Sequence, residues 1–444
     1  MSVAEREPFW LEVVHSTFSA LKFRNYRLWF TGQLVSLFGT WMQISAQGFL
    51  VFELTGSSAY LGYVAFAAGL PSWLFMLWGG VVADRVSRRL LLLVTQSVMM
   101  LLATVLAALT FTGLVQPWHI VVLAACSGIA GAFDAPARLA FVPEMVSREE
   151  LTNAIALNST MFNTATALGP AVAGMVYAFA GPEWCFAANA VSFLAVLAAL
   201  GMMRMEPEER PPAHIGRRGM PQHEAAGMPQ HDSGGGSPAG VRPPTVMADL
   251  VEGLRFVVRE PNVRLLIGLI IVMSLFGVSF MTLMPAWASR ILGGDATTNG
   301  FLQSARGVGA LGGALFLAWL GRRAARGRML TRALFLAPLA VLVFSFIRWL
   351  PAALFFLAVS GVGLIVALNV TNSLLHSLAP DGLRGRVMSV YTLAFFGFVP
   401  LGGLLAGTLA SWWGEPSVVA LNAGISLVFA VLAQVLLSGI DRIH

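Results

Sequence analysis

Charged residues are scarce in this chain, and lysine is nearly absent from it. Only 11% of the 444 residues are charged, whereas soluble domains carry about 25%. The single lysine, Lys22, does not lie in a G-x-x-x-x-G-K-[ST] sequence, so a P-loop that binds ATP is excluded. No H-E-x-x-H or G-x-S-x-G sequence stands at an expected membrane–water boundary, which argues against a membrane protease or esterase.

Cysteine is also rare. The two cysteines, Cys126 and Cys185, lie in apolar stretches without paired spacing, so no disulfide framework is expected and both are interpreted as packing residues. A cleavable signal peptide is not expected either, because the first apolar segment is too long for a signal h-region and lacks an A-x-A site.

Long apolar segments fill most of the sequence. Hydrophobic residues make up 57% of the chain, and an α-helix needs about 20 of them in a row to cross a membrane. Closed β-barrels are excluded because their strands are short and alternate in polarity. We therefore predict an all-α membrane protein with twelve transmembrane helices in two pseudo-symmetric six-helix bundles. The predicted spans are 28–52, 59–83, 90–113, 118–137, 152–180, 184–203, 263–288, 299–320, 329–348, 352–375, 387–411 and 416–438.

A polar stretch, residues 205–247, separates the two sets of spans. It is rich in proline and glycine, and it contains the pentapeptide Gly-Met-Pro-Gln-His twice. This composition cannot bury enough apolar surface to offset the entropy of ordering, so we predict a flexible linker between domains 1–204 and 248–444. The repeated His223 and His231 lack cysteine or carboxylate neighbours at metal-ligand spacing, so no metal site is predicted.

Two further patterns predict how the chain lies in a membrane. Apolar and charged residues alternate just after the linker, which indicates a short amphipathic helix on the membrane surface before the seventh span. If the chain crosses the membrane twelve times, all basic residues except Arg290, Arg306 and Arg348 lie on the side that holds the two termini and the linker. Cytoplasmic loops are enriched in arginine and lysine, so both termini and the linker are placed in the cytoplasm.

The two halves of the sequence repeat each other. Three residues recur at a fixed offset, since Gly174, Gly181 and Asn189 are matched by Gly407, Gly414 and Asn422. Chance similarity between apolar helices does not readily give one offset across two spans. Repeated halves with a substrate site between them are the usual architecture of secondary transporters.

The loop after the second span reads Gly80-Val-Val-Ala-Asp84-Arg85-Val-Ser-Arg88-Arg89. It resembles the G-x-x-x-D-R-x-G-R-R/K loop of the major facilitator superfamily, with a serine where the family usually has glycine; the equivalent loop of the second half lacks the aspartate. Other stretches resemble the branch that contains enterobactin exporters and macrolide or multidrug efflux proteins. They include Phe23-Arg-Asn-Tyr-Arg-Leu-Trp29, Asp134-Ala-Pro-Ala-Arg138 and Arg384-Gly-Arg-Val-Met388.

The resemblance covers the whole chain except the linker, and it implies a function. It implies a proton-coupled exporter of amphipathic small molecules, such as a drug, macrolide or siderophore, working by alternating access in a bacterial cytoplasmic membrane. The implied partners are the substrate, protons and the lipid bilayer, with no nucleic acid, no cofactor and a monomeric state. Two alternatives remain open: a lipid or lysolipid flippase on the same fold, and a membrane sensor or assembly partner that does not transport.

The resemblance also implies a cytoplasmic gate. Asp84 is expected to contact the start of the eleventh helix, near Arg386, when the inner side closes, because a helix N-terminus presents unpaired N–H groups. Asp134 is expected to pair with Arg88. The expected gate residues are Asp84, Arg85, Arg88, Arg89, Asp134, Arg138, Arg384 and Arg386.

Ionisable residues inside spans are costly and are functional candidates. Glu53 ends the first span on the outer side and Asp134 ends the fourth on the inner side, so both are candidates for proton coupling, with a solvated cap as the alternative for Glu53. Arg306 lies inside the eighth span, where lining a cavity and snorkelling to the outer surface are both open.

Uncharged polar residues inside spans are candidates for substrate contact, because small-molecule sites combine apolar walls with a few polar groups. The candidate cavity residues are Gln33, Trp41, Gln43, Gln47, Asn163, Gln303, Arg306 and Asn369. For each of them, hydrogen bonding and packing between helices is the alternative. Gly169, Pro170 and Gly174 resemble part of the fifth-helix glycine–proline packing motif of superfamily antiporters.

Overall fold

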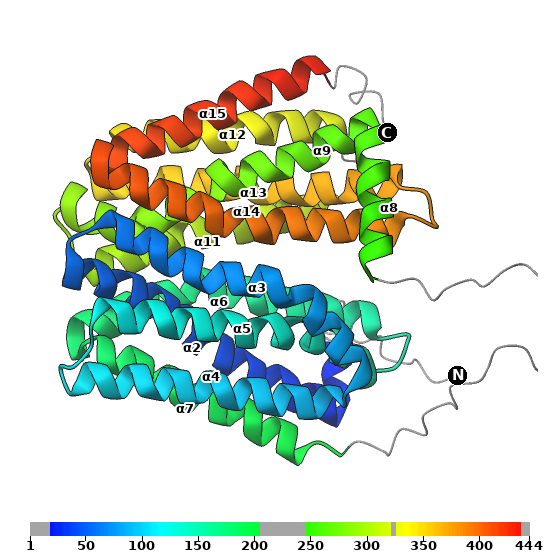
Figure 1. Cartoon of the computed structure of the whole chain (residues 1–444), viewed down its shortest axis with the longest axis horizontal. Helices are drawn as coiled ribbons and strands as arrows, with labels where there is room; N and C mark the ends of the chain where they lie inside the picture. The colour runs from blue at the N-terminus through cyan, green and yellow to red at the C-terminus, as the bar shows by residue number, and fades with distance from the viewer. Residues whose placement is uncertain (1–17, 205–245, 321–325, 437–444) are drawn as a thin grey trace, which may run out of the picture.

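The computed structural model describes residues 18–204, 246–320 and 326–436, and these residues form long helices in two bundles, which Figure 1 shows one above the other. No β-strand occurs in these three segments. The N-terminal bundle contains η1 (Ser19–Lys22), α2 (Arg24–Thr55), α3 (Ser58–Arg85), α4 (Arg88–Phe111), α5 (Pro117–Phe141), η2 (Val142–Glu144), α6 (Leu151–Ala180) and α7 (Pro182–Met202). The C-terminal bundle contains α8 (Val246–Arg259), α9 (Pro261–Val272), η3 (Met273–Val278), η4 (Ser279–Leu283), α10 (Met284–Ala286), η5 (Trp287–Ile291), α11 (Ala296–Leu320), α12 (Arg326–Phe346), α13 (Leu350–Leu378), α14 (Arg384–Trp413) and α15 (Glu415–Leu436).

Most of these helices are suited to a membrane. Within the described segments, eleven helical stretches are long and apolar enough to cross one, including the composite stretch Pro261–Ile291. Helix α6 is outside this set, although its 30 residues span about 45 Å, because Asn153, Asn158 and Asn163 lower its mean hydropathy. The prediction of an all-α membrane protein is confirmed, and the count of twelve spans stays a prediction.

Close approaches between the bundles follow the sequence repeat. A Cβ at Gly174 of α6 would lie 2.5 Å from the carbonyl oxygen of Ala296, at the start of α11. A Cβ at Gly407 of α14 would lie 2.6 Å from the carbonyl oxygen of Ser58, at the start of α3. Both positions therefore require glycine for the same reason, since each lets its helix approach a helix of the other bundle, and the repeat relates the pair α6 and α11 to the pair α14 and α3.

The seventh predicted span, 263–288, is not one regular helix. After α9 the backbone passes through a π-helical turn, a 3₁₀ turn, the short α10 and a second π-helical turn. Such irregular turns inside a helix often mark functional sites. Here they carry Phe276, Phe280 and Thr282, which line the two cavities described below.

The helix bundle has two ends, which we name by their residues. The arginine-rich face holds the ends of α3 and α5 and the start of α14, and the latch face holds the turns at Gly56, Gly181 and Gly414. Helix α8 lies across the helix ends at the arginine-rich face (Figure 1). A helix is thus present where the sequence predicts one, and its position on a membrane surface stays a prediction. The predicted linker, 205–247, lies outside the described residues, apart from its last two residues, Val246 and Met247, which begin α8.

Candidate functional site

A central cavity lies between the two bundles. It has a volume of about 1690 Å³, part of it open to solvent, and it is lined by α2 to α7 from one bundle and by η4, α10 and α11 from the other. Most of its wall is apolar. Five of the eight cavity candidates line it: Trp41, Gln43, Gln47, Gln303 and Arg306. A roomy apolar space with a few polar groups is suited to an amphipathic small molecule.

Amide and hydroxyl side chains connect the two bundles beside this cavity. The Gln303 amide donates to the Ser45 hydroxyl at 3.1 Å and to the Asn299 side-chain oxygen at 3.0 Å. Within the N-terminal bundle, the Asn189 amide donates to the Gln43 side-chain oxygen at 2.7 Å. These side chains form hydrogen bonds with one another, so a polar ligand that binds them would have to replace those hydrogen bonds with its own.

Three of the candidates do not line the cavity. Gln33 is only 1% exposed, and its amide nitrogen has no hydrogen-bond partner among the described residues. Asn163 is partly buried and Asn369 is exposed, and neither belongs to the cavity wall. Arg306 lines the cavity, so the alternative of snorkelling to the outer surface is wrong for this conformation.

Asp134 is the buried acid of the cavity. Its side chain is 0% exposed and accepts hydrogen bonds from the Thr95 hydroxyl at 2.9 Å and the Gln96 amide at 2.8 Å. Arg138, one turn later on α5, forms an ion pair with its other carboxylate oxygen. Three side chains thus hold one carboxylate, which explains how a charge is kept inside a membrane helix.

The expected pair between Arg88 and Asp134 is wrong. Arg88 forms an ion pair with Glu144 of η2, and it donates to the Ala140 carbonyl at 3.3 Å. Asp134 lies about two turns before the end of α5, deeper than its predicted place at the end of the span, and Arg138 is its nearest cation.

The other arginines of the expected gate bind within their own bundle. Arg89 donates to the Gly201 carbonyl at 3.1 Å, and Arg384 pairs with Asp381 at 2.8 Å. Arg85 is exposed at the end of α3.

Asp84 and Arg386 do not contact each other in this conformation. Asp84 is exposed, and Arg386 forms an ion pair with Glu252 of α8 at 2.8 Å. The described hydrogen bonds between the bundles extend no nearer to this face than the Trp73 indole, which donates to the Leu393 carbonyl at 3.1 Å. The cytoplasmic gate is therefore not assembled here, and its role stays a prediction.

The opposite face is closed by a contact that the sequence did not reveal. Arg290 pairs with Glu415 at 2.8 Å and donates to the Gly56 carbonyl of the other bundle. The Ser58 hydroxyl donates to Glu415 at 2.6 Å, and the Arg290 guanidinium lies over the Phe52 ring at 5.0 Å from its centre. We call Gly56, Ser58, Arg290 and Glu415 the outer latch. The only sequence signal was Arg290, one of three basic residues away from the arginine-rich side.

Glu53 lies near the outer latch and not in the cavity wall. Its carboxylate accepts a hydrogen bond from the Tyr177 hydroxyl, and the residue is exposed. The glycine–proline motif lies deeper, where a Cβ at Gly169 would lie 2.7 Å from Trp41. After Pro170, the backbone N–H of Ala171 donates to the Ser304 hydroxyl of α11 at 2.9 Å.

Metal ligands are not grouped in the part of the chain that the structure describes, and both cysteines there are free. The repeated His223 and His231 lie outside this part.

Comparison with known proteins extends over nearly the whole chain. The model of the transmembrane secretion effector family matches residues 15–216 and 238–441. The staphyloferrin A transporter of Staphylococcus aureus is 24% identical, covering 87% of this chain and 90% of that protein. The multidrug efflux pump Tap of Mycolicibacterium fortuitum is 27% identical, covering 84% of this chain and 86% of that protein.

The fold is also that of solved transporters. A bacterial homologue of the iron transporter ferroportin, in an inward-facing state, matches with a TM-score of 0.65 and 15% identity, covering 94% of this chain and 99% of that one. At this identity the likeness concerns the fold alone. The expected resemblance to major facilitator exporters is confirmed, and so is the expectation of a transporter and not an enzyme. The chain is a multi-pass membrane transporter that belongs to the transmembrane secretion effector family of the major facilitator superfamily.

Proposed function

We propose that the chain exports amphipathic small molecules by alternating access, driven by proton entry, and that the described conformation is the one open to the cytoplasm. The observation that carries this proposal is the central cavity, which reaches Asp134 and Arg138 near the arginine-rich face while the outer latch closes the other face. Arginine enrichment on the open side supports its assignment to the cytoplasm.

The distribution of contacts supports two states. The described hydrogen bonds join the bundles at the latch face and not at the arginine-rich face, which is the distribution that one half of a rocking cycle requires. The closed inner state would need Asp84 to approach the start of α14, as the family resemblance implies. Each state then has its own set of ion pairs, so substrate and protons can shift the balance between them.

Proton coupling is assigned to Asp134 in preference to Glu53. Asp134 lines the cavity and is buried, whereas Glu53 is exposed near the outer latch. Protonation of Asp134 would remove the charge that Arg138 now balances, and thereby change the cavity between transport steps.

Transport in inside-out vesicles tests the proposal. Anionic, neutral and cationic fluorescent amphiphiles are offered outside, with an acidic lumen. We expect at least one to accumulate in vesicles that contain the protein, and a protonophore to abolish the accumulation. Accumulation that survives the protonophore but needs ATP would overturn proton coupling, and no accumulation of any amphiphile would overturn export.

The orientation has its own test. Single cysteines are placed at Thr112, which is exposed at the latch face, and at Asp381, which is exposed at the arginine-rich face. A membrane-impermeant maleimide should label Thr112→Cys in intact cells and Asp381→Cys only after permeabilisation. The reverse labelling pattern would show that the topology is opposite to the proposed one, and the proposed direction of transport would then be uptake.

A further inference from the structure

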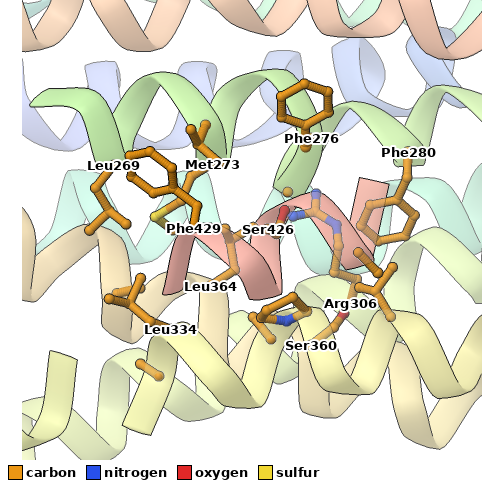
Figure 2. Close-up of a pocket in the computed structure, with 18 residues that line it drawn as sticks. Leu269, Met273, Phe276, Phe280, Arg306, Leu334, Ser360, Leu364, Ser426 and Phe429 are labelled. Carbon is orange, nitrogen blue, oxygen red and sulfur yellow. The ribbon is translucent and has the colours of Figure 1, made fainter. Parts of the chain in front are cut away.

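A second cavity lies inside the C-terminal bundle and meets the central cavity at Arg306. It has a volume of about 570 Å³, which includes space open to solvent, and it lies among α9, η3, η4 and helices α11, α12, α13 and α15. Figure 2 shows the Arg306 guanidinium at one end, between Phe276, Phe280 and Ser426, and Leu269 and Leu334 toward the other end. Arg306 lines both cavities, so the two spaces share one cationic group.

The wall of this second cavity is almost entirely apolar. Among the residues that the structure describes, Arg306 is the only ionisable one in this wall, and Ser360 and Ser426 carry its only hydroxyls. Both hydroxyls already donate to backbone carbonyls, at 2.7 Å and 2.8 Å. The cavity is therefore an apolar compartment with a cation at its entrance.

Arg306 has no counter-ion among the described residues. No carboxylate of the three described segments forms an ion pair with it, and its Nε has no hydrogen-bond partner there. It lies about 15 Å along α11 from the start of that helix, well inside the span. An arginine at such depth without a partner is costly, and positions of this kind are functional by default.

The central cavity does not supply the missing negative charge. Within the described segments, its charged lining residues are Asp134, Arg138 and Arg306. Asp134 is already held by Arg138, Thr95 and Gln96, so one positive charge is left unbalanced. A cationic substrate would add a second uncompensated charge to this space, whereas an anionic one would neutralise it.

We propose that the transported substrates are amphipathic anions, whose carboxylate, sulfonate or phosphate binds Arg306 and whose apolar part enters the cavity of the C-terminal bundle. This inference rests on the proposed function, because it names the substrate class of the same transport site. The planar guanidinium fork binds such oxyanions through two parallel hydrogen bonds, which a lysine does not provide.

Matched probes of one size test the charge preference without any substitution. The purified protein in phosphatidylcholine nanodiscs is titrated by calorimetry with 1-naphthaleneacetate, with neutral 1-naphthaleneacetamide and with cationic 1-naphthylmethylamine. We expect the carboxylate to bind roughly tenfold or more tightly than the amide, and the amine to bind most weakly. Equal affinities of carboxylate and amide in the wild-type protein would overturn the proposal.

Variants then assign the preference to one residue. Arg306→Gln should bind the carboxylate and the amide equally, with the affinity for the amide retained, and Arg306→Lys should keep part of the preference. Arg348→Gln is the matched control, because Arg348 stacks on Trp287 away from both cavities. A preference that survives in Arg306→Gln, or that disappears in Arg348→Gln, would overturn the assignment.

Two further arms separate related outcomes. Nanodiscs that contain phosphatidylglycerol show whether a lipid phosphate competes: displacement of 1-naphthaleneacetate assigns the anion to a lipid headgroup, and no displacement assigns it to a soluble molecule. Vesicle transport is measured beside binding. If binding depends on Arg306 but no transport is found, the proposed export is wrong and the anion site is supported. If neutral and cationic amphiphiles are transported, and Arg306→Gln does not change their transport, export is supported and the anion site is wrong.

Discussion

Arg290 and Glu415 lie 2.8 Å apart at the latch face, and both belong to the C-terminal bundle. Each also contacts the N-terminal bundle, Arg290 through the Gly56 carbonyl and Glu415 through the Ser58 hydroxyl. The pair therefore connects the two bundles at the turn between α2 and α3. Its carboxylate is 3% exposed, so water can replace few of these hydrogen bonds unless the face opens.

Glu415→Gln should weaken the outer latch. The amide keeps the shape of the carboxylate but loses the ion pair, which is worth about 1 kcal/mol after allowance for the partial exposure of Arg290. We expect roughly a fivefold shift toward a conformation open at the latch face. Spin labels at Thr112 and Trp349, both exposed at this face, would report it by pulsed EPR as a larger population of long distances.

Glu183→Gln is the control for this variant. Glu183 lies in the first turn of α7, which the sequence repeat relates to α15, and it forms no described ion pair with the other bundle. In Glu183→Gln, the distribution of distances between the labels at Thr112 and Trp349 should match that of the wild type. If Glu415→Gln gives the same distribution as Glu183→Gln, the latch does not hold this face closed.

Asp84→Asn should weaken closure of the arginine-rich face without changing the described conformation, in which Asp84 is exposed. A carboxylate at the start of a helix is worth about 1–3 kcal/mol when charged hydrogen bonds form. Spin labels at Glu149 and Gly382 should therefore show a loss of the short-distance population by roughly fivefold or more, with reduced transport.

Glu252→Gln should act in the opposite direction. Glu252 now pairs with Arg386, and its removal takes one partner from the arginine that lies near the expected position of Asp84. The short-distance population should rise in Glu252→Gln and fall in Asp84→Asn. Shifts of the same sign in both variants would contradict an exchange of Arg386 between α8 and α3.

The helices could be predicted from the sequence because their signal is local. Apolar length places a span wherever about 20 such residues occur, and the irregular stretch Pro261–Ile291 differs only in its internal geometry. The equivalence of Gly174 and Gly407 was also visible, because a close approach of backbones demands glycine and the repeat conserves the spacing.

Side-chain partners could not be predicted, because they depend on helix rotation and on residues far away in the chain. Gln33 and Gln43 lie on one helix, yet only Gln43 faces the cavity. Arg88 was expected to pair with Asp134 but binds Glu144, which the 3₁₀ turn η2 brings close. Glu415 is 357 residues from Ser58, and no local pattern indicates their contact.

The contact between η1 and the start of α6 should weaken at acidic pH. Lys22 and Ser19 donate to Glu150 at the start of α6, and these hydrogen bonds, Lys22 first, lower the pKa of Glu150 below 4.5. A carboxylate whose pKa is depressed on folding contributes fully above 4.5, and the contribution is lost as the pH falls through its lowered value. A spin label at Phe18 should therefore keep its mobility from pH 7 to pH 5 and become more mobile near pH 3.

Lys22→Met should raise the mobility of that label at pH 7 and reduce the acid response. Glu149→Gln is the matched control, because the hydrogen bond from Ser147 is the main cause that lowers the pKa of Glu149, and Glu149 does not bind η1. High salt should reproduce part of the Lys22→Met effect, since the lysine is exposed. An acid response that is unchanged in Lys22→Met would show that Glu150 does not hold η1.

Asp134→Asn and Glu53→Gln should separate the two candidate proton carriers. Each substitution removes one titratable carboxylate and keeps its size, so the hydrogen bond from Thr95 in one case and from Tyr177 in the other can persist. If Asp134 carries the proton, Asp134→Asn vesicles should lose the acidification-driven accumulation of substrate but still exchange substrate down its own gradient, because a fixed neutral side chain cannot couple the two flows. Glu53→Gln should keep both activities.

The lumenal pH, read with a trapped dye while substrate is added, checks the same point directly. Proton release from the lumen should accompany substrate uptake in Glu53→Gln and be absent in Asp134→Asn. Coupled proton release in Asp134→Asn would exclude Asp134, and its loss in Glu53→Gln alone would move the coupling site to the outer end of α2.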